Sequence, residues 1–231
     1  MDSARPVGAP AQRPLAAGAE PGFSGGGLNE SPRVLLLVDW ISTFDHENAR
    51  QLSAPALTAA AKTARLKRRL ASTGVQAVYA NDNYGVWRSD FRALLRTCID
   101  RGGTGAEIAR LLQPGPEDIA VLKARHSAFF ETPLQLLLQK LNTRELVLAG
   151  IATEWCVLFT AVDAYVRGYS LWVPADCVAS HSVERHRAAL AYIQEVLGAE
   201  IAESDAPAGA GPAALRGPVD NSGLQRSRSP A

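Results

Sequence analysis

Between residues 33 and 203 the chain alternates short apolar runs with longer stretches of helical character, and this alternation limits the folds it can adopt. The first run, Arg33–Val38, is apolar on both faces, as a buried parallel strand requires. Further runs lie at 75–80, 118–122, 145–149 and 169–173, with a weaker one at 200–202. Strands that alternate with helices are joined by right-handed crossovers. The pattern therefore predicts an α/β fold of the doubly wound, Rossmann-like type, with three αβα layers around a six-stranded parallel sheet.

The stretches between the runs carry signals for helix starts and ends. Ser53 is suited to cap the first helix, with Pro55 in its first turn and Gly74 near its end. Thr153 and Ser182 are suited to cap two later helices in the same way. Helices are also expected at 88–98, 103–112, 133–141, 154–167 and 182–197.

The two ends of the chain differ in composition from the part between them. Gly, Pro and Ala fill 17 of the first 32 positions and 14 of the last 28, and 14 of the 15 aromatic residues lie between 33 and 203. Segments so poor in large side chains bury too little apolar area to offset the entropy lost on ordering. We therefore expect disordered tails at 1–32 and 204–231 around one domain at 33–203.

Charge and cysteine content exclude several classes of protein. The 24 basic and 23 acidic residues give a net charge of +1, which offers no electrostatic footprint for nucleic acid or an anionic membrane surface. Three widely spaced cysteines do not suit a disulfide-stapled secreted scaffold. No apolar run reaches about 18 residues, and the N-terminal segment does not resemble a signal peptide. We expect a soluble, cytoplasmic protein that binds a small molecule, with no nucleic acid and no membrane partner.

Three ionisable residues lie just beyond the ends of expected strands. Asp39 follows the first strand, Lys123 follows the third, and Cys156 lies shortly after the fourth. Taken singly, each has an ordinary structural explanation: a turn residue, a surface charge and a small core residue. In doubly wound sheets, however, ligands bind beyond the carboxyl ends of the strands, and the predicted topology brings all three residues to that edge.

Together these residues suit acyl transfer. Thr153 as a cap would place Cys156 in the first turn of a helix, where the helix dipole and Lys123 would favour a thiolate nucleophile. Asp39 would take the thiol proton and later return it to a leaving nitrogen. Free backbone N–H groups at the same helix start would bind a developing oxyanion.

Six motifs lie in order along the core: Leu35–Asp39, Asn81–Phe91, Lys123–Phe129, Leu148–Cys156, Asp163–Gly168 and Pro174–Ser180. Their order and spacing resemble those of the isochorismatase-like cysteine hydrolases over about 33–201. The resemblance implies a catalytic triad of Asp39, Lys123 and Cys156. It also implies a cis peptide bond between Ile151 and Ala152, which would direct the amides of Ala152 and Cys156 at the oxyanion.

The resemblance leaves the substrate open, since family members hydrolyse nicotinamide, carbamoyl and ureido amides, or the vinyl ether of isochorismate. Nicotinamidases of the family carry an Asp and two His metal ligands near the second strand. Because this chain has no histidine between His46 and His126, we expect no metal and no cofactor. The leading interpretation is hydrolysis of a C–N bond in a small amide, carbamoyl or ureido compound through a thioester. The alternatives are vinyl-ether hydrolysis with Asp39 as general acid, and a non-catalytic binding subunit of the same fold.

Residues near the strand ends and the triad are candidates for the wall of the substrate pocket. They are Trp40, Phe44, Tyr84, Trp87, Arg88, His126 and Trp155. For each aromatic residue, ordinary core packing is an equal alternative to a place in the pocket wall. Arg88 suits bidentate binding of a substrate carboxylate, but a solvent-facing position on a helix is the more ordinary interpretation. Cys98 and Cys177 are expected to be buried packing residues. The resemblance also implies a homodimer or a homotetramer.

Overall fold

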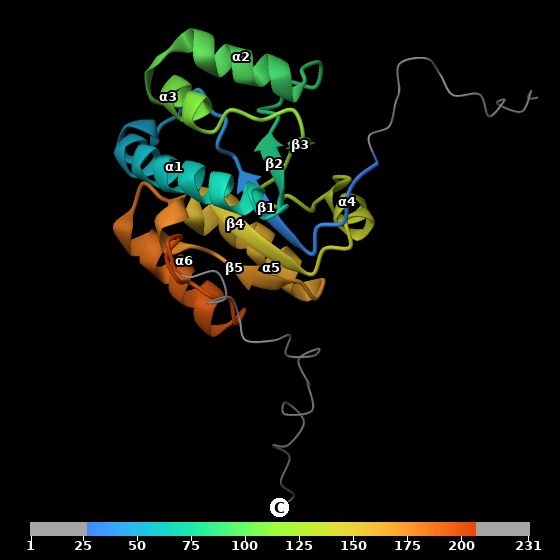
Figure 1. Cartoon of the computed structure of the whole chain (residues 1–231). Coiled ribbons are helices and arrows are strands. Elements are labelled where there is room, and N and C mark those ends of the chain that lie inside the picture. Colours follow the sequence, from blue (N-terminus) through green and yellow to red (C-terminus); the bar gives the residue numbers. More distant parts are fainter. Residues whose placement is uncertain (1–26, 207–231) are drawn as a thin grey trace, which may run out of the picture.

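The computed structural model describes residues 27–206, which form a parallel β-sheet with helices on both faces (Figure 1). The strands are β1 (Arg33–Val38), β2 (Gln76–Asp82), β3 (Ile119–Lys123), β4 (Glu145–Ile151), β5 (Ser170–Trp172) and β6 (Val178–Ala179). Their order is β3-β2-β1-β4-β5, and β6 pairs with the carboxyl end of β4. All of these pairings are parallel. The predicted six-stranded parallel sheet is confirmed.

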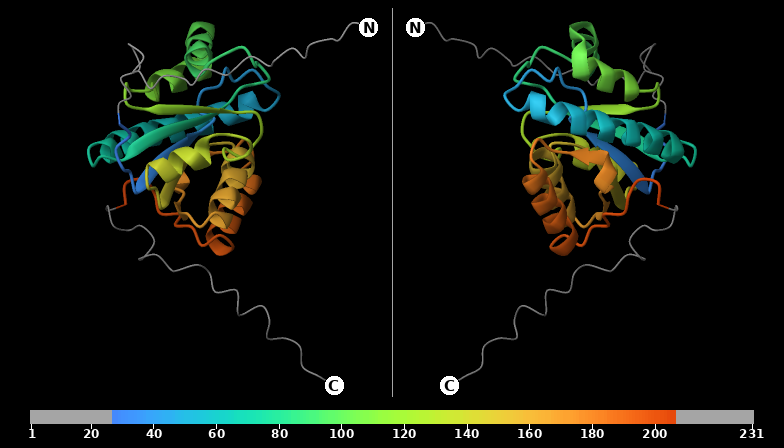
Figure 2. Two further views of the ribbon diagram at one scale, coloured as in Figure 1. Left: turned by 90° about the vertical axis from the view of Figure 1, so that its right-hand side faces the viewer. Right: turned by 90° about the vertical axis from the view of Figure 1, so that its left-hand side faces the viewer.

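Two hydrophobic cores join the sheet to its helices and produce the three predicted layers (Figure 2). The helices are α1 (Ala49–Ala71), α2 (Phe91–Arg101), α3 (Gly103–Leu111), α4 (Leu134–Lys140), α5 (Leu158–Val166) and α6 (Val183–Glu195). One core packs α1, α2 and α3 on one face of the sheet, and the other packs α4, α5 and α6 on the opposite face. Leu35 and Leu37 of β1 belong to the first core, whereas Leu36 and Val38 belong to the second. Both faces of β1 are therefore apolar, and each buried side chain contributes about 1.5–3 kcal/mol.

The sixth strand lies in a different place from the prediction. The sequence indicated residues 200–202, but β6 is Val178–Ala179, and Glu200 makes only an isolated bridge to Trp172. The Glu200 carbonyl still accepts a hydrogen bond from the Val173 amide at 2.8 Å, so this segment lies along the edge strand. The prediction was wrong because a strand of two residues is too short to show a recognisable hydrophobic pattern.

The first helix begins earlier than predicted. Because α1 starts at Ala49, Ser53 lies inside the helix, where its hydroxyl donates to the Ala49 carbonyl at 2.7 Å. Pro55 is also inside the helix rather than in its first turn. The residue at the true start is Asn48, a residue type that favours this position, but its side chain makes no capping hydrogen bond.

The predicted cap at Thr153 is wrong, and the predicted cap at Ser182 is confirmed. Thr153–Val157 form a π-helical turn, η1, directly before α5, and no side chain caps it. The Thr153 hydroxyl instead lies 2.9 Å from Nδ1 of His186 in α6. Ser182 accepts a hydrogen bond from the Arg185 amide at the start of α6. A tertiary partner therefore overrides the local capping preference of Thr153.

Ordered structure extends slightly beyond the predicted limits of the domain. Ser31 is buried, and its hydroxyl accepts a hydrogen bond from the Gln76 amide at 2.9 Å. Ser204 is also buried, and its amide and hydroxyl both donate to the Asp176 carboxylate. Hydrogen bonds made by single serine residues are not visible in a hydrophobic pattern. The sequence therefore predicted narrower limits for the domain, 33–203. The remainder of both predicted tails lies outside the described residues.

The structure also bears on the cysteines and on membrane association. Cys98 and Cys177 are buried free thiols, as predicted, whereas Cys156 is partly exposed. Within residues 27–206, no helix has the length and apolar character needed to cross a membrane. The cytoplasmic location and the homodimer or homotetramer stay predictions.

Candidate active site

Asp39, Lys123 and Cys156 meet at the carboxyl edge of the sheet. The Lys123 ammonium Nζ lies 2.7 Å from Asp39 Oδ2 and 3.5 Å from Cys156 Sγ. Asp39 follows β1, Lys123 is the last residue of β3, and Cys156 lies in η1 beyond β4. Because β2 and β1 separate β3 from β4 in the sheet, the long lysine side chain bridges the two ends of the cluster. The fold thus brings together the three residues that the sequence places beyond the strand ends.

The backbone around Asp39 fixes the direction of its carboxylate. Asp39 has a left-handed φ of 54°, a conformation that Asp tolerates better than most residues. Its amide donates to the Ala80 carbonyl at 3.1 Å and so continues the pairing of β1 with β2. Its Oδ1 accepts a hydrogen bond from the Asp82 amide at 2.6 Å, which leaves Oδ2 to face Lys123.

The close approach of β4 to β1 depends on Gly150. Gly150 pairs with Val38 in the parallel register, and a Cβ at Gly150 would collide with the carbonyl oxygen and side chain of Val38. A residue without a side chain is therefore required directly before the turn that carries Cys156. Gly150 in this way sets the separation between Asp39 on one strand and Cys156 beyond the other.

The Lys123 side chain is completely buried and surrounded by acceptors. Besides its contacts with Asp39 and Cys156, its Nζ donates to the Arg125 carbonyl oxygen at 3.1 Å and lies 3.6 Å from Asp82 Oδ2. Asp82 was not among the predicted site residues, although it ends β2 and obeys the same strand-end rule. Two carboxylates therefore face one ammonium group beside the thiol.

Burial and this charge balance decide the protonation of the three residues. Burial raises the pKa of the Asp39 carboxyl, and the Lys123 ammonium offsets only part of that effect. Burial alone would lower the pKa of Lys123, but the surrounding negative charges, Asp39 first, raise it above its usual value. Burial and then the Asp39 charge raise the pKa of the Cys156 thiol. Burial first, and then the Asp39 charge, therefore oppose the thiolate that the sequence led us to expect, and the Lys123 ammonium offsets only part of their effect.

The turn between β4 and α5 presents Cys156 and its neighbouring amides. The Ile151–Ala152 peptide bond is cis, as the resemblance implied. The Ala152 carbonyl accepts hydrogen bonds from the amides of Trp155 and Val157, at 3.1 and 3.3 Å. These hydrogen bonds occupy the Ala152 carbonyl oxygen and involve neither the Ala152 nor the Cys156 amide. Those two amides remain the candidates for the oxyanion site.

Three aromatic rings line one side of Cys156. His126 Nδ1 lies 3.6 Å from Cys156 Sγ, and the His126 ring centroid is 5.1 Å from that of Trp155. Phe159 completes the cluster, with its ring 5.5 Å from His126 and stacked on Trp155. Phe159 was not predicted, although its position four residues after Trp155 places both on one helical face. All three rings are exposed and available to a bound molecule.

The segment after β2 places one predicted residue, Tyr84, against the loop that follows Asp39. Tyr84 is 48% exposed as a whole, but its hydroxyl donates to the Ile41 carbonyl at 3.2 Å, and desolvation of that hydroxyl, followed by the Asp39 charge, raises its pKa. Trp87 is 79% exposed and Arg88 is also exposed. Within residues 27–206, no hydrogen bond or ion pair joins Trp87 or Arg88 to the triad. Their place in the pocket wall therefore stays a prediction.

Trp40 and Phe44 pack into the core under α1. Trp40 has no exposed surface, and its indole Nε1 has no hydrogen-bond partner among the described residues. Phe44 is partly buried against the same core. Trp40 therefore does not line an open pocket in this conformation, because a side chain without exposed surface cannot touch a bound molecule.

The residues that follow β2 do not fit a divalent metal site. Asp82 Oδ1 accepts a hydrogen bond from the Tyr84 amide at 2.7 Å, and its Oδ2 faces Lys123. No histidine lies between Asp82 and Phe91. In the part of the chain that the structure describes, no three His, Cys, Asp or Glu side chains are grouped so as to hold a metal ion. The donor set therefore supports no metal-dependent step.

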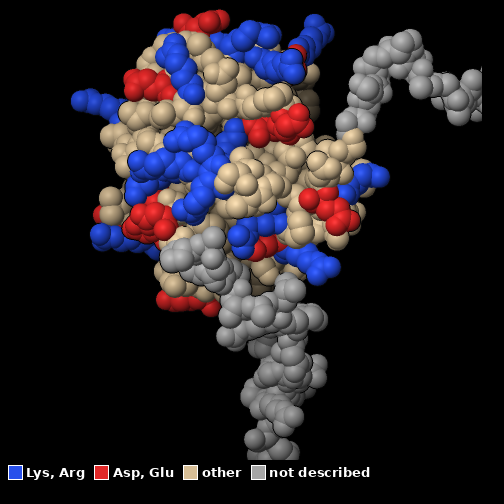
Figure 3. Space-filling view, in the orientation of Figure 1, with Lys and Arg blue, Asp and Glu red and all other residues tan. Residues whose placement is uncertain are grey.

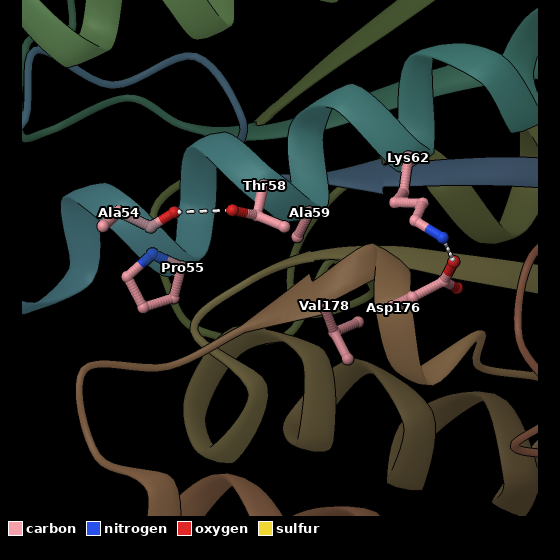
Figure 4. A pocket seen from close by; sticks show the side chains of 7 residues that line it. All are labelled: Ala54, Pro55, Thr58, Ala59, Lys62, Asp176 and Val178. Carbon is pink, nitrogen blue, oxygen red and sulfur yellow. Dashed lines mark hydrogen bonds and ion pairs between the residues drawn. The ribbon is translucent and has the colours of Figure 1, made fainter.

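A separate, shallow cavity of about 420 Å³ lies between α1 and β6 (Figure 4). It is lined by Ala54, Pro55, Thr58, Ala59, Lys62, Asp176 and Val178. An ion pair of 3.4 Å between Lys62 and Asp176 closes one end, and further basic side chains of α1 gather on this face of the molecule (Figure 3). The lining contains no residue of the triad, so this cavity is not the candidate active site.

Known proteins resemble the chain over the whole region that builds this site. A family model described as "Isochorismatase domain" matches residues 33–206. The uncharacterized isochorismatase family protein YaaI of Bacillus subtilis is 35% identical over 174 residues, which is 75% of this chain and 95% of YaaI. Maleamate amidohydrolase of Pseudomonas putida is 29% identical over 189 residues, which is 78% of this chain and 87% of that protein. The crystal structure of nicotinamidase/pyrazinamidase PncA from Bacillus subtilis aligns with a TM-score of 0.60 and 28% identity, covering 74% of this chain and 99% of that one.

Proposed function

The chain belongs to the isochorismatase family of hydrolases, and we propose that it is a cysteine hydrolase that cleaves a C–N bond of a small amide, carbamoyl or ureido compound through a thioester. One observation carries the proposal: Lys123 Nζ contacts both Asp39 Oδ2, at 2.7 Å, and Cys156 Sγ, at 3.5 Å. The names of two similar proteins, a maleamate amidohydrolase and a nicotinamidase/pyrazinamidase, also favour amide chemistry.

The first half of the reaction forms the thioester. Asp39 accepts the proton of the Cys156 thiol while Sγ attacks the substrate carbonyl carbon. The oxygen of the tetrahedral intermediate takes hydrogen bonds from the amides of Ala152 and Cys156. The intermediate collapses with cleavage of the C–N bond, and Asp39 returns its proton to the departing nitrogen. The products of this half are an amine or ammonia and an acyl group on Cys156.

The second half restores the enzyme with water. Asp39, again a carboxylate, takes a proton from a water molecule whose oxygen attacks the thioester carbonyl. The second tetrahedral intermediate expels the Cys156 sulfur, which regains a proton from Asp39. The raised pKa of Asp39 suits both directions of transfer, because its burial makes it a stronger base than an exposed carboxylate. The substrate leaves as an acid.

Lys123 takes no proton in this scheme and acts through its charge. Its Nζ lies between the carboxylate that receives the thiol proton and the sulfur that loses it. When the proton moves, negative charge passes from Asp39 to Cys156 Sγ, and the ammonium group stays within reach of both. A buried cation at this position lowers the free energy of the thiolate form at the moment of attack.

The surroundings of Cys156 favour a small planar substrate. The rings of His126, Trp155 and Phe159 offer an exposed aromatic wall beside the sulfur. Flat amide, carbamoyl and ureido groups stack on such a wall with little loss of conformational entropy.

A second candidate is hydrolysis of a vinyl ether of the isochorismate type. Here Asp39 donates a proton to the vinyl carbon, water adds to the resulting cation and returns a proton to Asp39, and the hemiketal then breaks its ether C–O bond to give a ketone and an alcohol. Cys156 takes no covalent part. The observation that favours this reaction is the raised pKa of Asp39, which increases the fraction of the carboxyl that carries a proton.

A substrate panel separates the two reactions. We expect the protein to release ammonia or an amine from at least one member of a panel of small amides, carbamoyl compounds and ureides. For that compound, Cys156→Ala and Cys156→Ser abolish turnover. On isochorismate the vinyl-ether scheme predicts the opposite: Cys156→Ser remains active and Asp39→Asn does not. Full turnover of an amide by Cys156→Ala would overturn the thioester scheme.

A further inference from the structure

Four groups surround the Lys123 ammonium, and two of them are carboxylates. Asp39 Oδ2 and Asp82 Oδ2 lie 2.7 and 3.6 Å from Nζ, and the Arg125 carbonyl and Cys156 Sγ lie 3.1 and 3.5 Å away. The thioester scheme uses Asp39, Cys156 and Lys123 and gives no role to Asp82.

Asp82 contacts both charged members of the triad. Its amide donates to Asp39 Oδ1 at 2.6 Å, and its carboxylate faces Lys123. Its side chain is 29% exposed, against 9% for Asp39. Water therefore reaches the Asp82 carboxylate, whereas the Asp39 carboxylate is shielded from water and is stabilised by the Lys123 ammonium and by hydrogen bonds, including the one from the Asp82 amide.

We propose that Asp82 is a positioning residue that serves as the permanent counter-ion of Lys123 and thereby lets Asp39 alternate between carboxylate and carboxylic acid. This inference rests on the proposed function. Whenever Asp39 holds the proton, the wholly buried Lys123 ammonium has lost its nearest carboxylate. An unpaired buried charge is costly, and the Asp82 carboxylate keeps the ammonium paired at that stage.

Besides Lys123 and its two carboxylates, three titratable groups belong to this cluster or face it. Cys156 comes from η1, His126 lies after β3 with Nδ1 3.6 Å from the sulfur, and Tyr84 follows β2. The Tyr84 hydroxyl donates to the carbonyl of Ile41, two residues after Asp39, and desolvation, followed by the charge of Asp39 and more weakly that of Asp82, raises its pKa. Of these groups, Cys156 gives the most direct signal, because its alkylation can be followed without a substrate.

The first test follows the reaction of Cys156 with iodoacetamide as a function of pH, resolved by peptide mass spectrometry. Asp82→Asn removes the charge and keeps an Oδ1 acceptor for the Tyr84 amide. With one carboxylate fewer around Lys123 Nζ, the ammonium is less neutralised and stabilises the Cys156 thiolate more, so the midpoint pH of alkylation falls by about one unit. Asp82→Glu, which keeps the charge, restores the midpoint.

Asp90→Asn is the matched control. Asp90 is exposed, and its Oδ1 accepts a hydrogen bond from the Ala93 amide, so the substitution again removes a charge and keeps an acceptor. We expect the midpoint of this variant to equal that of the parent protein. An unchanged midpoint in Asp82→Asn, or an equal shift in Asp90→Asn, would overturn the inference.

The second test uses Asp39→Asn as a mimic of the protonated carboxyl. If Asp82 holds Lys123 while Asp39 is neutral, the urea midpoint of Asp39→Asn/Asp82→Asn falls by more than the two single variants together, because only the double variant leaves the ammonium unpaired. Additive losses would refute the counter-ion role. Both tests are independent of turnover, so they stand apart from the substrate panel that tests the proposed function.

Discussion

Replacing Lys123 with methionine tests the electrostatic core of the site. The change keeps an unbranched side chain of similar length and removes the ammonium that pairs with Asp39. With an effective dielectric constant of about 20, unit charges 2.7 Å apart attract by about 6 kcal/mol. Part of this attraction offsets the free energy of removing the two charges from water. Removing one partner of a buried ion pair costs about 3–5 kcal/mol of the free energy of unfolding. We expect Lys123→Met to lose about that much of the free energy of unfolding near neutral pH.

The loss of unfolding free energy in Lys123→Met depends on pH, and the titration of Asp39 determines whether it grows or shrinks as the pH rises. Burial already raises the pKa of this carboxyl, and removal of Lys123 raises it further. A carboxyl whose pKa is higher in the folded state contributes most to stability below its unfolded pKa of about 3.9, and this contribution is lost as the pH rises through the folded pKa. Each pH unit in that window costs about 1.4 kcal/mol, so a loss of 3–5 kcal/mol develops over about two to four units. The difference between variant and parent is therefore small in acid and grows towards neutral pH.

The assay is urea unfolding of the parent and of Lys123→Met at a series of pH values from acid to neutral. Lys140→Met is the matched control, since Lys140 is an exposed residue of α4, and we expect it to remain close to the parent throughout. A loss for Lys123→Met that is below about 1 kcal/mol, or that does not change with pH, would refute the reasoning.

The remaining predictions concern the strand contact, the last helix and the thiols. Gly150→Ala forces a Cβ into the Val38 carbonyl, so we expect a loss of about 1–3 kcal/mol in thermal unfolding, and a wild-type midpoint would contradict it. Ser182→Ala removes the cap of α6 and costs about 1 kcal/mol in the same assay, whereas Ser182→Asn stays near the parent. Titration with a thiol reagent modifies Cys156 in the folded protein and the two buried thiols only after unfolding, and rapid reaction of all three would contradict the packing described here.

The fold was predictable from sequence because its long strands are apolar on both faces. The β1 segment was bounded correctly at Arg33–Val38, since all of its side chains except the first are buried in one of the two cores. The errors fell where tertiary contacts replace local signals. The two residues of β6 form no pattern, and Thr153 bonds to His186 instead of capping a helix.

The sequence predicted which residues form the site, because they lie at strand ends. It predicted the distribution of charge among them less well. The rule that ligands lie at the carboxyl edge selected Asp39, Lys123 and Cys156, which the structure brings together. The charge distribution was harder to predict, because the sequence does not show how Lys123 Nζ divides its contacts between Asp39 Oδ2, at 2.7 Å, and Cys156 Sγ, at 3.5 Å. Asp82 was overlooked because the expected second strand ended at residue 80, two residues before the observed end of β2, so the strand-end rule was not applied to it.

The central claim is that Cys156 is the nucleophile of an amide hydrolase, and one measurement tests it most directly. The protein is mixed with a compound from the substrate panel that it hydrolyses. The reaction is quenched in acid during turnover, and the protein is digested for mass spectrometry. We expect the acyl mass on the peptide that contains Cys156, and a loss of turnover on the order of 10³-fold or more in Cys156→Ala. Undiminished turnover in Cys156→Ala, with no acyl mass on that peptide in the parent protein, would contradict the account.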